Sequence, residues 1–141
     1  MNSLQSPEVV IVAPTRELAI QIYNETRKFA NNSVLKSVIL YGGTVVSHQL
    51  GNIQRGCNIL VATPGRLKDF VERGVVDFVK VLFFILDEAD RMLDMGFGPD
   101  IELIAKHPTM TPVVSSLSIL LIKISLLKLG IYLFHREKGK H

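Results

Sequence analysis

Short apolar runs alternate with longer amphipathic stretches along residues 8–110. The apolar runs predict strands at residues 9–13, 38–41, 58–62 and 81–86, and the amphipathic stretches predict helices at 16–30, 45–53, 64–71 and 100–107. Strands and helices in regular alternation indicate βαβ crossovers, which produce a parallel sheet. The pattern therefore predicts an α/β fold in which helices flank a parallel sheet.

The segments after the first three strands share turn and capping residues. Right-handed crossovers bring the carboxyl ends of parallel strands to one edge of the sheet, where open α/β sheets bind ligands. Each segment holds a threonine placed to cap a helix, namely Thr15, Thr44 or Thr63, and Pro64 suits a first helical residue. Because free N–H groups at a helix start favour anions, three such segments can follow successive phosphates of one nucleic-acid strand.

Glycines and arginines in these segments strengthen that interpretation. Gly42 and Gly43 let the backbone approach a phosphate without an intervening Cβ, and Arg16 and Arg66 can add charge-assisted contacts. Since Tyr41 is the one aromatic residue expected to be exposed in these segments, binding should follow the sugar-phosphate backbone and be insensitive to base sequence. Taken singly, each segment is more often plain turn chemistry; their recurrence at one edge favours the functional interpretation.

The fourth apolar run ends in acidic residues. Residues 81–86 suit a strand buried on both faces, and Asp87, Glu88 and Asp90 follow directly at its carboxyl end. One carboxylate there can hold Mg²⁺, usually through water, while the next orients a water that attacks a phosphate. The alternative is an acidic start to the following helix, where carboxylates favour the positive end of the helix dipole.

The distribution of charge limits the nucleic-acid interpretation. The 141 residues suit one domain, and the single cysteine excludes an internal disulfide. Residues 1–111 hold 11 Lys and Arg against 12 Asp and Glu, a net charge of −1, whereas residues 112–141 hold 5 against 1, a net charge of +4. The basic character belongs to the tail, so RNA binding by the first part must depend on local geometry.

Four segments resemble motifs of the DEAD-box RNA helicases. The run DEADRMLDMGF at 87–97 resembles motif II, APTRELA at 13–19 motif Ia, YGG at 41–43 the GG motif and ATPGRL at 62–67 motif Ib. The stretches between them look most like the vasa branch, which is tied to germ-line RNA. The resemblance implies a partial RecA-like domain of the P-loop NTPase type at residues 1–111, without its P-loop strand, and a tail at 112–141 that is unlike the family.

The resemblance also implies roles for individual residues. Single-stranded RNA would be held through its backbone by Pro14, Thr15, Arg16, Gly42, Gly43, Thr63, Pro64, Gly65 and Arg66. In the catalytic set, Asp87 would serve Mg²⁺ through water, Glu88 the attacking water, and Asp90, with Arg91, the coupling between domains. The implied cofactors are ATP and Mg²⁺, the implied partner is RNA, and the implied location is the cytoplasm, in germ granules for a vasa-like protein.

The sequence departs from the family in several parts. The 141 residues contain no G-x-x-x-x-G-K-[ST] P-loop, no Q motif for adenine, no Ser-Ala-Thr motif III and no second RecA-like domain. We therefore expect that this chain alone does not hydrolyse ATP, although the intact family couples hydrolysis to RNA unwinding. The alternatives are a non-enzymatic RNA-binding or interaction fragment, and a gene-model remnant.

The tail and the missing strand give two further expectations. Residues 112–141 are expected to be helical or disordered, and 117–134 approach the length of a membrane span. Lys123 and Lys128 disfavour an anchor there, because a lysine near the bilayer centre costs about 2.5–3.5 kcal/mol. Loss of the P-loop strand is expected to leave residues 9–12 and 81–86 as open strand edges, which favour self-association.

Overall fold

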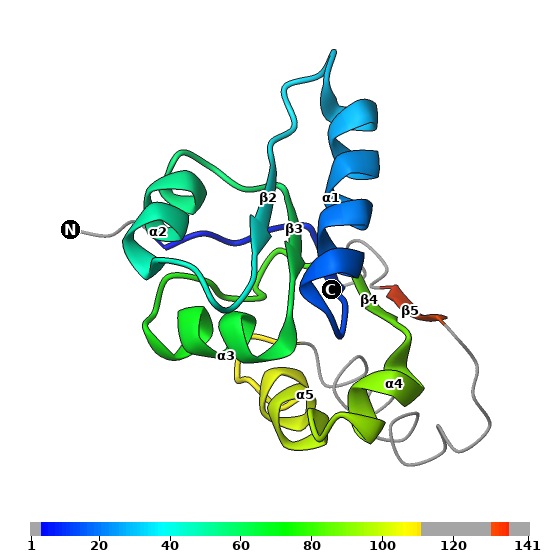
Figure 1. The fold of residues 1–141 in the computed structure, drawn as a ribbon. Helices are drawn as coiled ribbons and strands as arrows, with labels where there is room; N and C mark the ends of the chain where they lie inside the picture. Colours follow the sequence, from blue (N-terminus) through cyan, green and yellow to red (C-terminus); the bar gives the residue numbers. More distant parts are fainter. Residues whose placement is uncertain (1–3, 111–130, 136–141) are drawn as a thin grey trace.

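A computed structural model describes residues 4–110 and 131–135 of the chain. Strands and helices alternate from the start, as the apolar pattern predicts (Figure 1). The elements in chain order are β1 (Val9–Val12), α1 (Arg16–Ala30), β2 (Ser37–Leu40), α2 (Val46–Gln54), β3 (Ile59–Ala62), α3 (Pro64–Glu72), β4 (Phe83–Asp87), α4 (Ala89–Asp94), α5 (Gly98–Ala105) and β5 (Ile131–His135).

The sheet has the strand order β2-β3-β1-β4-β5. Its first four strands are parallel, and their register aligns the carboxyl ends: Ala62 pairs with both Leu40 and Val12, and Val12 pairs with Leu86. The predicted α/β fold with a parallel sheet is therefore confirmed. The four segments that follow these strands leave the sheet at one edge. They can therefore form the shared site that was predicted from the sequence.

The expectation of an open edge at residues 9–12 is wrong. β1 lies inside the sheet and pairs with β3 on one side and with β4 on the other, so its backbone needs no further strand. The far side of β4 pairs with β5, which runs antiparallel to it, so residues 83–87 are not an open edge either. Neither strand therefore has the open edge that was expected to favour self-association, because β1 has a neighbour on each side and β5 covers the far side of β4.

β5 is the one element that the structure describes within residues 112–141. Residues 131–135 form a strand rather than part of a helix. Most of the expected tail helix and of the candidate span at 117–134 lies outside the described residues. Within the described ranges, no helix is both long and apolar enough to cross a membrane.

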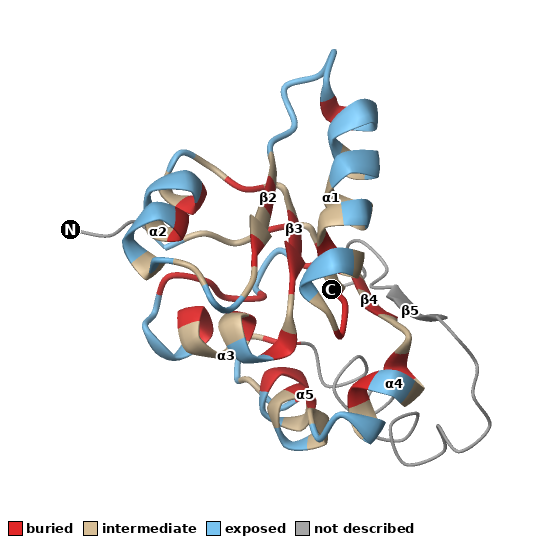
Figure 2. Ribbon diagram, viewed as in Figure 1, coloured by how far each residue is buried: buried red, intermediate tan, exposed pale blue. Residues whose placement is uncertain are grey.

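Helices cover the two faces of the sheet unequally (Figure 2). One face of the strands packs against the apolar sides of α2, α3, α4 and α5 in the larger core cluster, which includes the fully buried Phe70, Phe78 and Phe84. The other face packs against α1 through Ala19 and its neighbours. β4 consequently alternates buried and half-buried residues, so the prediction of a strand buried on both faces holds fully for one face only.

Candidate functional site

The first junction, between β1 and α1, combines a helix cap with an exposed arginine. Pro14 is buried, and Thr15 takes the N-cap position with its hydroxyl accepting a hydrogen bond from the Leu18 N–H at 3.2 Å. The predicted cap is therefore confirmed. Arg16 begins α1 and is exposed, and its guanidinium lies 4.8 Å from the centroid of the Tyr41 ring. This cation–π contact turns the first arginine toward the second junction.

The second junction is the GG loop, residues 41–44, which follows β2. Gly42 and Gly43 are exposed, and a Cβ built on either would meet no atom within 4 Å. Gly43 has a φ of +82°, which favours glycine, whereas nothing in the fold requires glycine at position 42. The predicted cap at Thr44 is wrong: Val45 is the N-cap residue of α2, and the Thr44 hydroxyl bonds back to the Tyr41 carbonyl at 3.3 Å.

Gln49 closes the GG loop from inside α2 and was missed by the sequence reasoning. Its side chain is only 4% exposed, and its Nε2 donates to the Tyr41 carbonyl at 2.9 Å and to Thr44 Oγ1 at 2.7 Å. The available signal was its spacing, because Gln49 lies three residues after Val46 and four before Ile53, on the apolar stripe of the helix. A polar residue in that position needs a hydrogen-bonding reason.

The third junction, between β3 and α3, brings the second arginine to the GG loop. Pro64 is the first helical residue, as predicted, but the N-cap residue Thr63 makes no side-chain cap bond. Gly65 is exposed, and a Cβ there would meet no atom within 4 Å. Arg66 Nη2 donates to the Thr44 carbonyl at 3.1 Å, while its Nη1 is shielded from solvent and has no hydrogen-bond partner among the described residues. This charge is incompletely satisfied and would stabilise a nearby anion.

The three junctions form one connected edge. Arg16 reaches the GG loop at the Tyr41 ring, and Arg66 reaches it at the Thr44 carbonyl. The structure thus brings the predicted RNA-contacting segments together through the GG loop, a connection that sequence spacing alone did not predict.

The fourth junction holds a half-buried carboxylate, Asp87, followed by a carboxylate on a strained backbone, Glu88. Asp87 ends β4, and Glu88 adopts φ 52° and ψ 50°, the left-handed region that is unfavourable for a side chain. Burial raises the pKa of the Asp87 carboxyl above its ordinary value; the Glu88 charge raises it further, and a backbone hydrogen bond from Glu88 opposes the rise. Both residues therefore oppose folding to some degree, which is typical of functional positions.

The other two acidic-motif residues lie on α4. Asp90 is half-buried in the first turn of the helix, and Arg91 is exposed and pairs with Glu88, with Nη1 and Oε2 3.3 Å apart. Because both partners of this pair are substantially exposed, it orients the Glu88 side chain more than it stabilises the fold.

Asp87→Asn is expected to raise the free energy of unfolding at pH 7. A raised pKa means that the native state binds the proton more tightly than the unfolded chain, so stability is lost as pH rises from the ordinary value of 3.8 through the raised native value. Urea denaturation at several pH values between 4 and 7 should show the advantage of the variant growing with pH. An advantage that is constant or shrinks with rising pH would contradict the assigned shift.

The donor set fits Mg²⁺ better than it fits a nucleoside triphosphate. No group of three or more His, Cys, Asp or Glu residues within the described ranges could enclose a metal ion. Asp87 suits the usual Mg²⁺ mode, in which one or two carboxylates act with waters and substrate phosphates. The 141 residues include no Gly-Lys-Ser or Gly-Lys-Thr sequence of the kind that cradles β- and γ-phosphates.

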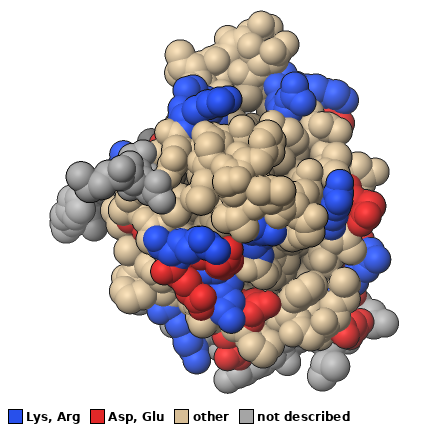
Figure 3. Space-filling model, turned by 60° about the vertical axis from the view of Figure 1, so that its left-hand side comes forward, with Lys and Arg blue, Asp and Glu red and all other residues tan. Residues whose placement is uncertain are grey.

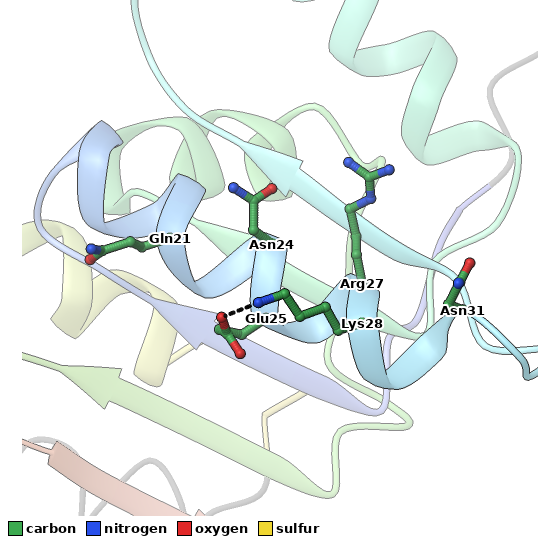
Figure 4. A pocket seen from close by; sticks show the side chains of 6 residues that line it. All are labelled: Gln21, Asn24, Glu25, Arg27, Lys28 and Asn31. Atoms are coloured by element: carbon green, nitrogen blue, oxygen red, sulfur yellow. Dashed lines mark hydrogen bonds and ion pairs between the residues drawn. The ribbon is translucent and has the colours of Figure 1, made fainter.

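Neither the surface charge nor the hollow along α1 indicates a nucleic-acid site other than the strand-end junctions. Lys and Arg are mixed with Asp and Glu over the visible face in Figure 3 rather than forming one basic field. A hollow of about 560 Å³ runs along the exposed side of α1, where Glu25 and Lys28 form an ion pair at 2.9 Å (Figure 4). None of its lining residues belongs to the four junctions, and this pair neutralises part of its charge.

Comparisons with known proteins agree with these motifs and this fold. The family model described as DEAD/DEAH box helicase matches residues 1–121. The chain is 60% identical over 109 residues to "ATP-dependent RNA helicase vasa" of Drosophila melanogaster, covering 77% of this chain and 16% of that protein. It is 50% identical over 109 residues to "Probable ATP-dependent RNA helicase DDX4" of Homo sapiens, covering 77% of this chain and 15% of that protein.

Solved structures give the same result at the level of the fold. The yeast DEAD-box splicing factor Prp28 superposes with a TM-score of 0.70 at 30% identity, over 97% of this chain and 34% of that one. A DEAD box protein from Methanococcus jannaschii superposes with a TM-score of 0.68 at 41% identity, over 76% of this chain and 29% of that one. The chain therefore belongs to the DEAD/DEAH box helicase family.

Proposed function

We propose that this chain supplies the RNA-binding edge and the water-activating carboxylates of a vasa-type, ATP-dependent RNA helicase. The observation that carries the proposal is the meeting of three strand ends at the GG loop, where Arg16 and Arg66 both make contact. Bare glycine backbone between two guanidinium groups suits a sugar-phosphate chain. A cytoplasmic, germ-line location is part of the same proposal, on the basis of the similarity to vasa.

The carboxylates at the β4–α4 junction support the second part of the proposal. Asp87 would hold Mg²⁺ through water, and Glu88, oriented by Arg91, would position the attacking water. The raised pKa of Asp87 and the left-handed backbone of Glu88 both disfavour the folded state. Because such unfavourable features are typical of functional sites, they support a chemical role for this junction. Asp90, in the first turn of α4, would couple this junction to a second domain.

A second candidate function is RNA binding without catalysis by this chain alone. The chain is expected to release no phosphate from ATP above background, because Asp87 and Glu88 lack a phosphate cradle in these 141 residues. A phosphate-release assay with and without RNA checks this expectation. RNA-stimulated release that disappears in Glu88→Gln would overturn it and favour the enzymatic alternative for this chain.

Arg66→Ala is expected to weaken binding of single-stranded RNA about tenfold and to the same degree for unrelated sequences. Its guanidinium lies at the GG loop, and loss of one phosphate contact should reduce the slope of log affinity against log salt by roughly 0.7. Fluorescence anisotropy with two unrelated oligonucleotides at several salt concentrations measures both quantities.

Arg73→Ala is the matched control for this test. Arg73 is the C-cap residue of the same helix and pairs with Asp69 at 3.0 Å, away from the strand ends. Its loss should leave RNA affinity nearly unchanged. Equal weakening by both substitutions would indicate a bulk charge effect, and a sequence-selective loss in Arg66→Ala would contradict backbone recognition.

A further inference from the structure

We propose that Gln49 is a positioning residue that holds the GG loop in the shape that receives an RNA phosphate. Gln49 lies outside the four motif segments, and nothing in the resemblance assigns it a role. The inference rests on the proposed RNA binding, which it deepens by naming the side chain that sets the geometry of the site.

Three hydrogen bonds close the GG loop into a ring. Gln49 Nε2 donates to the carbonyl that precedes the glycines, on Tyr41, and to the hydroxyl that follows them, on Thr44. The Thr44 hydroxyl donates in turn to the Tyr41 carbonyl at 3.3 Å. The two ends of the glycine pair are thereby fixed relative to each other and to α2, although glycine is the residue type with the fewest restrictions on its backbone.

The hydrogen bonds to the GG loop, rather than packing in the core, explain why a polar side chain is buried at position 49. The side chain is 4% exposed, and its Oε1 is shielded from solvent with no hydrogen-bond partner among the described residues. An unpaired buried acceptor opposes folding, and an apolar residue at this position would avoid that cost. What the amide provides is a pair of donor contacts to the GG loop.

The braced loop also fixes the groups that would meet the ligand. Gly42 and Gly43 face open space, and Arg66 donates to the carbonyl of Thr44, the residue that Gln49 also contacts. Gln49 thus sets the position of the bare backbone and, through Thr44, that of the guanidinium. Holding these groups in place before binding reduces the entropy lost when RNA binds.

Gln49→Met is expected to weaken affinity for single-stranded RNA roughly fivefold to tenfold while leaving the thermal midpoint nearly unchanged. Methionine has a similar length, removes both donors and also removes the unpaired acceptor, so the effects on stability oppose each other. Because no charge is lost, the salt dependence of binding should match that of the wild type, unlike that of Arg66→Ala. The probe is a fluorescent oligouridine.

Gln49→Glu provides a readout that a merely structural role would not produce. An ionised carboxylate only accepts hydrogen bonds and would repel the Tyr41 carbonyl, whereas the protonated acid restores one donor. RNA affinity of this variant, taken relative to the wild type at each pH, should recover as pH falls from 8 to 5. Gln49→Met should show no such recovery.

Thr44→Val tests the same ring from its other side. It removes the hydroxyl that accepts from Gln49, and its effect on RNA affinity should be non-additive with that of Gln49→Met. Wild-type RNA affinity in a folded Gln49→Met variant, or full additivity of the two substitutions, would overturn this inference and leave the proposed function in place. Absence of RNA binding by the wild-type chain would overturn the proposed function, and the inference with it.

Discussion

Gly65→Ala is expected to stabilise the chain and to weaken RNA binding at the same time. Gly65 lies in the first turn of α3 with no strained φ, and a Cβ there meets no atom within 4 Å, so alanine should raise the free energy of unfolding by about 0.5–1 kcal/mol. The same methyl group would stand between the helix start and an approaching phosphate. We expect RNA affinity to fall about tenfold or more, which is a loss of about 1.4 kcal/mol.

Gly51→Ala is the matched control. Gly51 is an exposed glycine inside α2 whose Cβ would also meet no atom within 4 Å, but it lies outside the junction segments. It should gain similar stability without loss of RNA affinity. Urea denaturation and fluorescence anisotropy on the two variants separate the effects. Unchanged RNA affinity in Gly65→Ala would show that this edge does not approach a ligand closely.

Phe84→Ala is expected to cost about 3–5 kcal/mol of stability. Phe84 is 1% exposed in the strand that carries Asp87, and its ring packs edge-on against Phe78 with centroids 6.4 Å apart. Truncation would leave a cavity between β4 and the helices that cover it. A loss of this size approaches the whole stability of many domains, so the acidic junction should lose its fixed position.

Phe29→Ala is the control for that prediction. Phe29 belongs to the same residue type but is 85% exposed near the end of α1, so its truncation should change stability by less than about 0.5 kcal/mol. Chemical denaturation of the two variants gives the comparison. Similar small losses in both would contradict the placement of β4 in the core.

The parallel part of the sheet could be predicted because its strands are short apolar runs separated by helices. β2, β3 and β4 lie within two residues of their predicted bounds, and α1 agrees at both ends. β5 could not be predicted, because its pairing depends on a distant free edge of β4 rather than on a local pattern. The expected open edges failed for the same reason, since strand order is a property of the whole sheet.

The residues of the candidate site were easier to predict than the contacts between them. Parallel register alone brings the three junctions to one edge. Capping propensity was correct at Thr15 but not at Thr44, whose hydroxyl is used by the GG loop instead. Gln49 was missed because a buried amide on an apolar stripe has no local motif, and its role depends on the path of the loop.

The most direct test of the central claim is a ¹H–¹⁵N NMR titration of the chain with two unrelated single-stranded RNA oligonucleotides. We expect the same amides to shift with both, centred on Gly42, Gly43 and Gly65 at the carboxyl edge of the sheet, where a Cβ on the backbone would meet no atom within 4 Å. Shifts confined to the hollow along α1, or a different set of amides for each oligonucleotide, would contradict it.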